Sequence, residues 1–161
     1  MHKPAQDLFN LRESIKKGDL SAINRAHDAG LLNNLMFDIV ESLTFKTSSM
    51  LVRAASFHAD FKQRDAQGNT LLHRLAQSQV QMLLVECELN VLIHCDYYQW
   101  AIEELVKQGL SIEDENNAKQ TPMDIAVHSK NIGFCEGVKI FENDQARRIQ
   151  EEKNQGTCVI T

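Results

Sequence analysis

Helix breakers and aromatic residues are scarce in this chain of 161 residues. It contains only 2 Pro and 7 Gly, and aromatic residues make up 6% of the sequence. Proline and glycine interrupt helices, whereas aromatic residues are enriched in strands. The shortage of all three argues against a turn-rich β-sandwich and favours an all-α fold.

Long apolar runs and an excess of positive charge are also missing. No segment approaches the roughly 18 apolar residues that a membrane span needs, and the first ten residues contain no apolar signal-peptide core. The chain has 17 basic and 22 acidic residues, for a net charge of −5, which argues against a nucleic-acid-binding surface. Apolar residues still make up 43% of the chain, enough for one domain with a buried core. We therefore expect a cytoplasmic protein with no nucleic-acid partner.

Motifs of known enzymes and metal sites are absent as well. The sequence contains no GxSxG, P-loop, GxGxxG or HExxH pattern. Cys87, His94, Cys95 and Asp96 lie close together in the chain, but their spacing matches no familiar zinc site, and burial as small hydrophobic residues explains the thiols equally well. Without a C-x-x-C pair or a signal peptide, a reducing compartment is favoured over a disulfide framework. We predict no enzyme activity, no cofactor and no metal.

The most informative segment runs from His58 to Ala76, HADFKQRDAQGNTLLHRLA. Residues 65–68 form a turn signature in which Gly68 can adopt a positive φ. Thr70 stands where it can cap a helix, and His73 occupies the third helical position. The segment therefore predicts a hairpin that leads into a capped helix.

A second copy runs from Gln108 to Ala126, QGLSIEDENNAKQTPMDIA. Thr121 provides a capping hydroxyl before Pro122 at the first helical turn, and Asp124 suits the positive end of the helix dipole. Both copies resemble the start of an ankyrin repeat, approximately GADxNxxDxxGxTPLHxAA. His58 replaces the first glycine of that pattern, Leu71 the proline, and in the second copy Gln120 is aligned with the turn glycine.

Two earlier segments resemble ankyrin helix pairs less closely. Residues 8–30 predict two short helices around a Lys-Gly-Asp turn, and residues 34–57 predict another apolar pair. The apolar residues expected on the shared faces of these helices are Leu8, Leu11, Ile15, Leu20, Ile23, Ala26, Leu35, Ile39, Leu43, Met50, Leu51 and Ala54. Thr70 and Thr121 are 51 residues apart, whereas the ankyrin period is about 33. We expect the extra residues around 79–97, with the first helix of that unit extended. The resemblance implies an ankyrin-repeat solenoid of about four units, at about 8–30, 31–60, 61–112 and 113–141, in a domain covering 1–141.

Residues 142–161 form a polar tail in which Ala146, Ile149 and Lys153 could prolong a helix. The last four residues, Cys158-Val159-Ile160-Thr161, match the C-a-a-X pattern of prenylated proteins. A short ankyrin protein with such an end is similar to effectors that intracellular bacterial pathogens inject into host cells, and that resemblance implies prenylation of Cys158 by the host and a site at a host membrane. The alternative is a chance terminal cysteine, because the tail has no polybasic patch as a second membrane signal.

The ankyrin resemblance implies a protein–protein interaction module that binds a partner through hairpin tips and inner helices, and for an effector that partner would be a host protein. Alternatives are a plain cytosolic adaptor or inhibitor without a lipid, and an undetected ligand or enzymatic site built by residues 79–97. The predicted contact residues lie in the two hairpins and on the inner helices: Lys62, Gln63, Arg64, Ala66, Gln67, Arg74, Gln77, Glu113, Asp114, Glu115, Asn116, Asn117 and His128.

Overall fold

The structure is a computed structural model that describes residues 4–42, 48–78 and 88–156, without the side chains of Pro4, 88–96 and 155–156. These residues form eight α-helices, one short 3-10 helix and no strand, so the predicted all-α class is confirmed in the described part of the chain. In chain order the elements are α1 (Pro4–Lys16), α2 (Ser21–Asp28), η1 (Leu32–Leu35), α3 (Met36–Glu41), α4 (Ser48–Ser56), α5 (Leu71–Gln77), α6 (Glu88–Lys107), α7 (Pro122–Ser129) and α8 (Ile132–Gly156).

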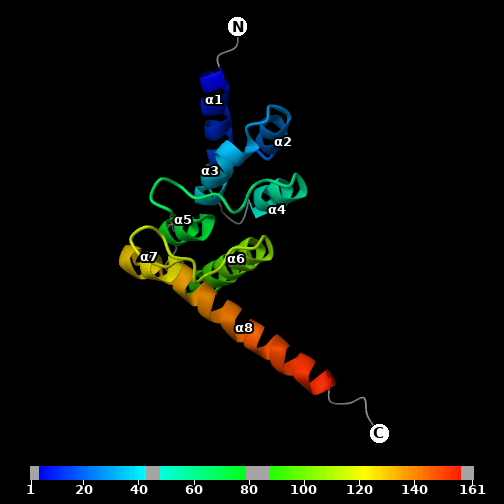
Figure 1. Cartoon of the computed structure of the whole chain (residues 1–161), viewed down its shortest axis with the longest axis vertical. Coiled ribbons are helices and arrows are strands. Elements are labelled where there is room, and N and C mark those ends of the chain that lie inside the picture. The colour runs from blue at the N-terminus through cyan, green and yellow to red at the C-terminus, as the bar shows by residue number, and fades with distance from the viewer. Residues whose placement is uncertain (1–3, 43–47, 79–87, 157–161) are drawn as a thin grey trace.

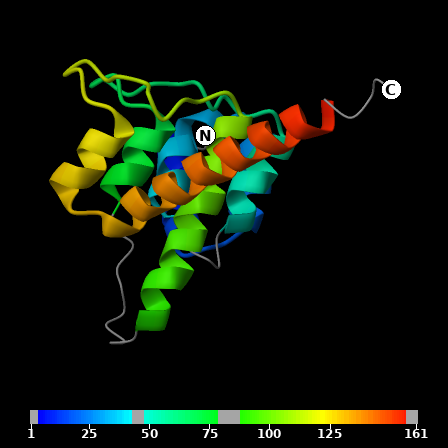
Figure 2. The same ribbon diagram turned by 90° about the horizontal axis from the view of Figure 1, so that it is seen from below.

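The helices are arranged as consecutive pairs that stack into two rows (Figure 1). In one row α1, α3, α5 and α7 each contact the next, and in the other row α2, α4, α6 and α8 do the same. Figure 2 shows that the extended segments before α5 and α7 project from the same side of the stack. Segments that are far apart in the sequence therefore lie side by side at the hairpin tips.

The core lies between the two rows and is built from apolar residues at helical spacing. Leu71, Leu72, Leu75 and Ala76 of α5 are all buried, because this short helix has neighbours on both sides in its row. The two N-terminal pairs bury the predicted Ile15, Ile23, Ala26, Leu35, Ile39, Met50, Leu51 and Ala54. Two residues of the predicted faces are not buried: Leu20 is 41% exposed and Leu8 is only partly buried. Leu43 lies outside the described residues.

The two predicted helix starts are confirmed. Thr70 has extended backbone angles and caps α5 in a capping box with His73. Thr121 caps α7 in the same way, with Pro122 at the first turn and the Asp124 carboxylate accepting from the Thr121 N–H. Each cap supplies partners to backbone N–H groups that a helix start leaves free.

The alignment of Gln120 with the turn glycine is wrong by one residue. Gly68 adopts a φ of +76°, and in the second hairpin the residue with positive φ is Lys119, at +60°. His58 likewise has a φ of +54° at the site where the family pattern has glycine. The backbone turn is therefore kept at both sites without glycine, although a residue with a Cβ atom is strained in the left-handed region.

The expected extension of the first helix in the third unit is also wrong. α5 ends at Gln77, and Ser78 is extended, with φ −67° and ψ 113°. The Ser78 carbonyl accepts hydrogen bonds from the Asn131 side chain and the Tyr98 hydroxyl, at 2.9 Å each, which holds it out of helical geometry. The second helix of this unit, α6, is the long one, with 20 residues. Residues 79–87 lie outside the described part.

α6 and α8 pack closely because α8 has two glycines on its contact face. A Cβ atom on Gly133 would lie 2.8 Å from the Tyr98 ring, and one on Gly137 would lie 2.9 Å from the Gln99 backbone nitrogen. α8 continues beyond Phe141 to Gly156, as the predicted helical prolongation requires. Arg148 of this continuation pairs with Glu103 of α6 at 3.1 Å, so the contact between the helices extends past residue 141.

Candidate protein-binding groove

The two hairpin tips, residues 60–70 and 111–121, are bonded directly to each other. The Asn117 N–H donates to the Gln67 carbonyl at 3.0 Å, and the Asn116 side chain donates to Asn69 Oδ1 at 2.9 Å. Arg64 donates to the Glu115 carbonyl at 2.8 Å. Backbone and side chains both contribute, so the second tip is held in one position against the first.

Each tip is closed by one side-chain acceptor at the start of its turn. Asp65 Oδ1 accepts from the N–H groups of Gln67 and Asn69, at 2.9 Å each. Partial burial acts to raise the pKa of Asp65, but the bonds from the Asn69 side chain and the two N–H groups outweigh it and leave that pKa below its ordinary value. The carboxylate is therefore kept ionised in the folded protein.

Asn116 performs the same task in the second tip. Its Oδ1 accepts from the N–H groups of Ala118 and Gln120, at 2.9 and 3.0 Å. Because Asn116 is 92% buried, the amide has exchanged water for these fixed partners. The two tips are thus locally alike, one with a charged acceptor and the other with a neutral one.

His73 connects the inner helix α5 to the second tip. Its Nε2 donates to the Gln120 carbonyl at 2.9 Å, since a carbonyl can only accept, which leaves Nδ1 to accept from the Thr70 N–H at 3.2 Å. Burial lowers the pKa of His73, and the Gln120 carbonyl opposes this only in part. The ring is therefore held neutral, and these contacts give His73 a structural role.

A hollow of about 500 Å³ lies between the tips and the inner helices α5 and α7. It contains no formally charged side chain among the described residues that line it. Six of the lining side chains are carboxamides: Gln67, Asn69, Gln77, Asn116, Asn117 and Gln120. The remainder of the lining is His73, Ile125 and two alanines, Ala66 and Ala118. We call this hollow the carboxamide groove.

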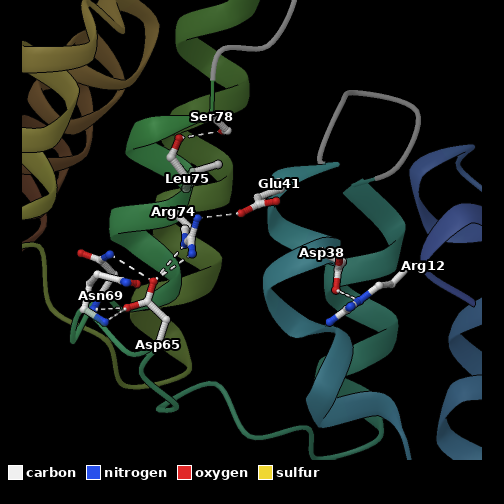
Figure 3. A network of polar contacts seen from close by, with 9 residues as sticks. Arg12, Asp38, Glu41, Asp65, Asn69, Arg74, Leu75 and Ser78 are labelled. Carbon is white, nitrogen blue, oxygen red and sulfur yellow. Dashed lines mark hydrogen bonds and ion pairs between the residues drawn. The ribbon is translucent and has the colours of Figure 1, made fainter. Parts of the chain in front are cut away.

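A second hollow, of about 300 Å³, shares the lining residue Gln77 with the first. Its other lining residues are Glu41, Arg74 and Ser78. Figure 3 shows Arg74 between Glu41 of α3 and Asp65 of the first tip. The Arg74 nitrogens lie 3.1 Å from Glu41 and 3.0 Å from Asp65, so the charges in this hollow are paired with each other.

The predicted contact residues divide into three groups. Gln67, Gln77, Asn116, Asn117 and Ala66 line the carboxamide groove. Arg64, Arg74, Asp114 and Glu115 hold the scaffold together, since Arg64 pairs with Asp114 at 3.4 Å and bonds to the Glu115 backbone. Lys62, Gln63, Glu113 and His128 line neither hollow.

Five residues that line the groove were not among the predicted contact residues: Asn69, His73, Ala118, Gln120 and Ile125. Asn69 and Gln120 occupy the same place in the two tips, directly before the capping threonine, and Ile125 follows one helical turn later. A correct alignment of the turn, with Lys119 matched to Gly68, would have paired Asn69 with Gln120. No sequence signal distinguished Ile125 from an ordinary core residue.

Two sequence predictions lie beyond the described structure. Cys158, the predicted lipidation site, and Cys87 are outside the described residues, and the side chains of His94, Cys95 and Asp96 are not described. In the part of the chain that is described, no cluster of three or more His, Cys, Asp or Glu side chains could hold a metal ion. None of the described helices is both long and apolar enough to cross a membrane.

Comparison with known proteins does not name a relative for this chain. The sequence matches no protein-family model, and no curated protein matches it significantly.

Proposed function

We propose that this protein is an ankyrin-type interaction module whose carboxamide groove binds a segment of a partner protein. One observation carries the proposal: two hairpin tips of the same local design lie side by side and enclose a hollow in which polar side chains are exposed. Paired helices stacked in two rows are what an ankyrin array requires. The capped helix starts at Thr70 and Thr121 support the same assignment.

The groove is ordered before a partner arrives. The tips are tied to each other through Asn117 and Gln67, and to α5 through His73 and Gln120. Arg74 adds ion pairs that join α3, α5 and the first tip. A surface held in this way loses little conformational entropy on binding, which favours a role in recognition.

Site-specific crosslinking tests this proposal. A photoreactive amino acid placed at Ala118, which lines the groove and is exposed, should crosslink a partner in a lysate of the cells in which the protein occurs. The same amino acid at Val52, which is 49% exposed on α4 of the other row, is the matched control. Excess unlabelled protein should compete for the crosslink, whereas a Gln67→Ala, Gln77→Ala double variant should not. Equal crosslinking from both positions would contradict the proposal.

Prenylation of Cys158 would add membrane recruitment to this binding role, as expected of a host-directed bacterial effector. The sequence motif alone supports it. Expression in eukaryotic cells with an N-terminal tag, followed by membrane fractionation and intact mass, tests the modification. A prenyl-sized mass increase that disappears in Cys158→Ser is expected, and an unmodified mass in the soluble fraction would leave the plain adaptor.

A further inference from the structure

The chemistry of the carboxamide groove indicates which kind of segment it binds. Carboxamides both donate and accept hydrogen bonds, and they carry no charge at any pH at which the protein is folded. His73 adds no cation, because burial lowers its pKa and both ring nitrogens already have partners. The lining can therefore match neutral polar groups, but it offers no counter-ion to a charged ligand.

The three less exposed carboxamides of the groove, Asn69, Asn116 and Gln120, form its floor and already make hydrogen bonds with one another. Asn116 Nδ2 donates to Asn69 Oδ1 at 2.9 Å and lies 3.4 Å from Gln120 Oε1, and Asn69 Nδ2 donates to Asp65 at 3.1 Å. These contacts fix the amide orientations, so the floor presents a defined pattern. A ligand does not have to break them in order to bind.

The rim retains unused capacity. Within the described part of the chain, the side-chain amides of Gln67 and Gln77 make no hydrogen bond, although both residues line the groove. Gln67 lies on the first tip and Gln77 at the end of α5, so the two amides come from separate elements of the lining. Each offers two donors and one acceptor oxygen, which is the complement of a peptide group.

The charged residues that flank the groove cannot serve a ligand without first losing a partner. Arg74 is shared between Asp65 and Glu41, and its guanidinium also lies 5.7 Å from the ring centroid of Phe37. Arg64 is occupied by Asp114 and by two backbone carbonyls. A ligand carboxylate or ammonium would thus lose water without gaining a free counter-charge.

We propose that the carboxamide groove binds an extended, uncharged polypeptide segment through its backbone amides and through Asn, Gln, Ser or Thr side chains. This inference rests on the proposed function and specifies its partner. Gln77 also lines the second hollow, so a segment held at Gln77 would lie beside the paired Arg74 and Glu41. Binding should depend little on salt, because no net charge is transferred from water.

Selection from a random-peptide phage library, with the full chain immobilised, tests the inference. Retained peptides are synthesised, and their affinities are measured by fluorescence anisotropy. We expect sequences with uncharged cores, and a Kd that changes less than about twofold between about 50 and 500 mM NaCl. Gln77→Met, which keeps the length of the side chain but removes the amide, should weaken binding about tenfold. Gln150→Ala on exposed α8 is the control and should leave the Kd unchanged.

The outcomes separate this inference from the function on which it rests. Peptides with charged cores, whose binding depends on Gln77 and falls steeply with salt, would overturn the inference but leave the groove as a binding site. A selection that retains no peptide, or only peptides insensitive to Gln67→Ala and Gln77→Ala, would overturn both. Circular dichroism of each variant establishes that a lost affinity is not a lost fold.

Discussion

The two hairpin tips make nearly the same hydrogen bonds with different residues. In each tip the first turn residue accepts from two backbone N–H groups, a role filled by Asp65 in one and by Asn116 in the other. The third helical residue after the tip accepts from the capping threonine, through the His73 ring in α5 and the Asp124 carboxylate in α7. The backbone therefore requires an acceptor at each site, not a particular residue type.

The same comparison reveals where the tips differ physically. The first tip depends on glycine for its positive φ and on a histidine that bridges to its neighbour, whereas the second tolerates Lys119 at the turn. The first tip is also crowded by the second, since a Cβ on Gly68 would lie 2.8 Å from Asn117 Cγ. Position in the stack, not local turn chemistry, makes the first tip the less tolerant of change.

The largest effect is expected from Gly68→Ala. The substitution forces alanine into a positive φ and pushes its Cβ against Asn117, so we expect a loss of about 3 kcal/mol in the free energy of unfolding, measured by urea denaturation. Gly30→Ala is the matched control, because Gly30 has a φ of +68° and nothing within 4 Å of the new Cβ. Equal losses in the two variants would contradict the crowding of the first tip by the second.

A second test separates the acceptor role of Asn116 from its donor role. Asn116→Ala should cost about 2 kcal/mol, because the N–H groups of Ala118 and Gln120 and the oxygen of Asn69 lose their buried partner. Asn116→Asp keeps the acceptor, but it replaces the donor with a charged oxygen that faces Asn69 Oδ1, so it should cost about 1 kcal/mol at neutral pH. Urea denaturation measures both. An aspartate variant as unstable as the alanine variant would show that the donor matters more.

The pH dependence of stability tests the bridging histidine. The pKa of His73 is lowered in the folded protein, so the unfolded chain binds more protons once the pH falls toward the ordinary histidine pKa of about 6.5. The contribution of His73 to the free energy of unfolding is therefore fully present above that pH and decreases as the pH falls below it. Asp65 and Asp124, whose pKa values are also lowered, lose their contribution only below about pH 4.

Urea denaturation of His73→Gln at pH 7.5 and about pH 5.5 is the measurement. Glutamine can still accept from the Thr70 N–H but does not titrate, so the decrease in stability between the two pH values should shrink in this variant. A decrease as large as that of the unaltered protein would assign the pH dependence to other groups.

The smallest effect is expected from Lys119→Gly, which should stabilise the second tip by about 0.5 kcal/mol. Lys119 has a positive φ, and this left-handed conformation has a steric free-energy cost for any residue with a Cβ atom. Glycine avoids that cost, and the larger conformational entropy that it loses on folding is a smaller penalty. Lys119 also pairs with Glu115 at 3.1 Å, but both side chains are exposed, so this pair contributes little. Lys119→Ala is the control, since it removes the pair but keeps the strain and should give no gain in thermal denaturation.

Several features of the fold were predictable because they depend on neighbouring residues in the sequence. The caps at Thr70 and Thr121 follow from a hydroxyl placed before an apolar helical run, and the positive φ of Gly68 follows from the turn signature. The buried faces of the N-terminal helices follow from helical spacing. Each of these is decided within one or two turns of chain.

The groove was only partly predictable, since it is made by contact between distant segments. Gln67, Gln77 and Asn117 were identified as exposed polar residues, but so were Arg64 and Arg74, which the structure uses as internal ties. Whether a polar side chain is free depends on what the neighbouring repeat places opposite it. The residue opposite is about 50 positions away in the chain, as Gln120 is from His73.

By itself the sequence determined the all-helical class, the two capped helix starts and the hairpin turns, because short-range sterics and hydrogen bonding select them. The tertiary structure decided where α5 ends and which polar groups face the groove. In each case a long-range contact was the cause: Asn131 and Tyr98 hold Ser78 extended, and the first tip receives Asn116 and Asn117 of the second. Stacking turns two similar local motifs into one asymmetric groove, since each tip has a different neighbour.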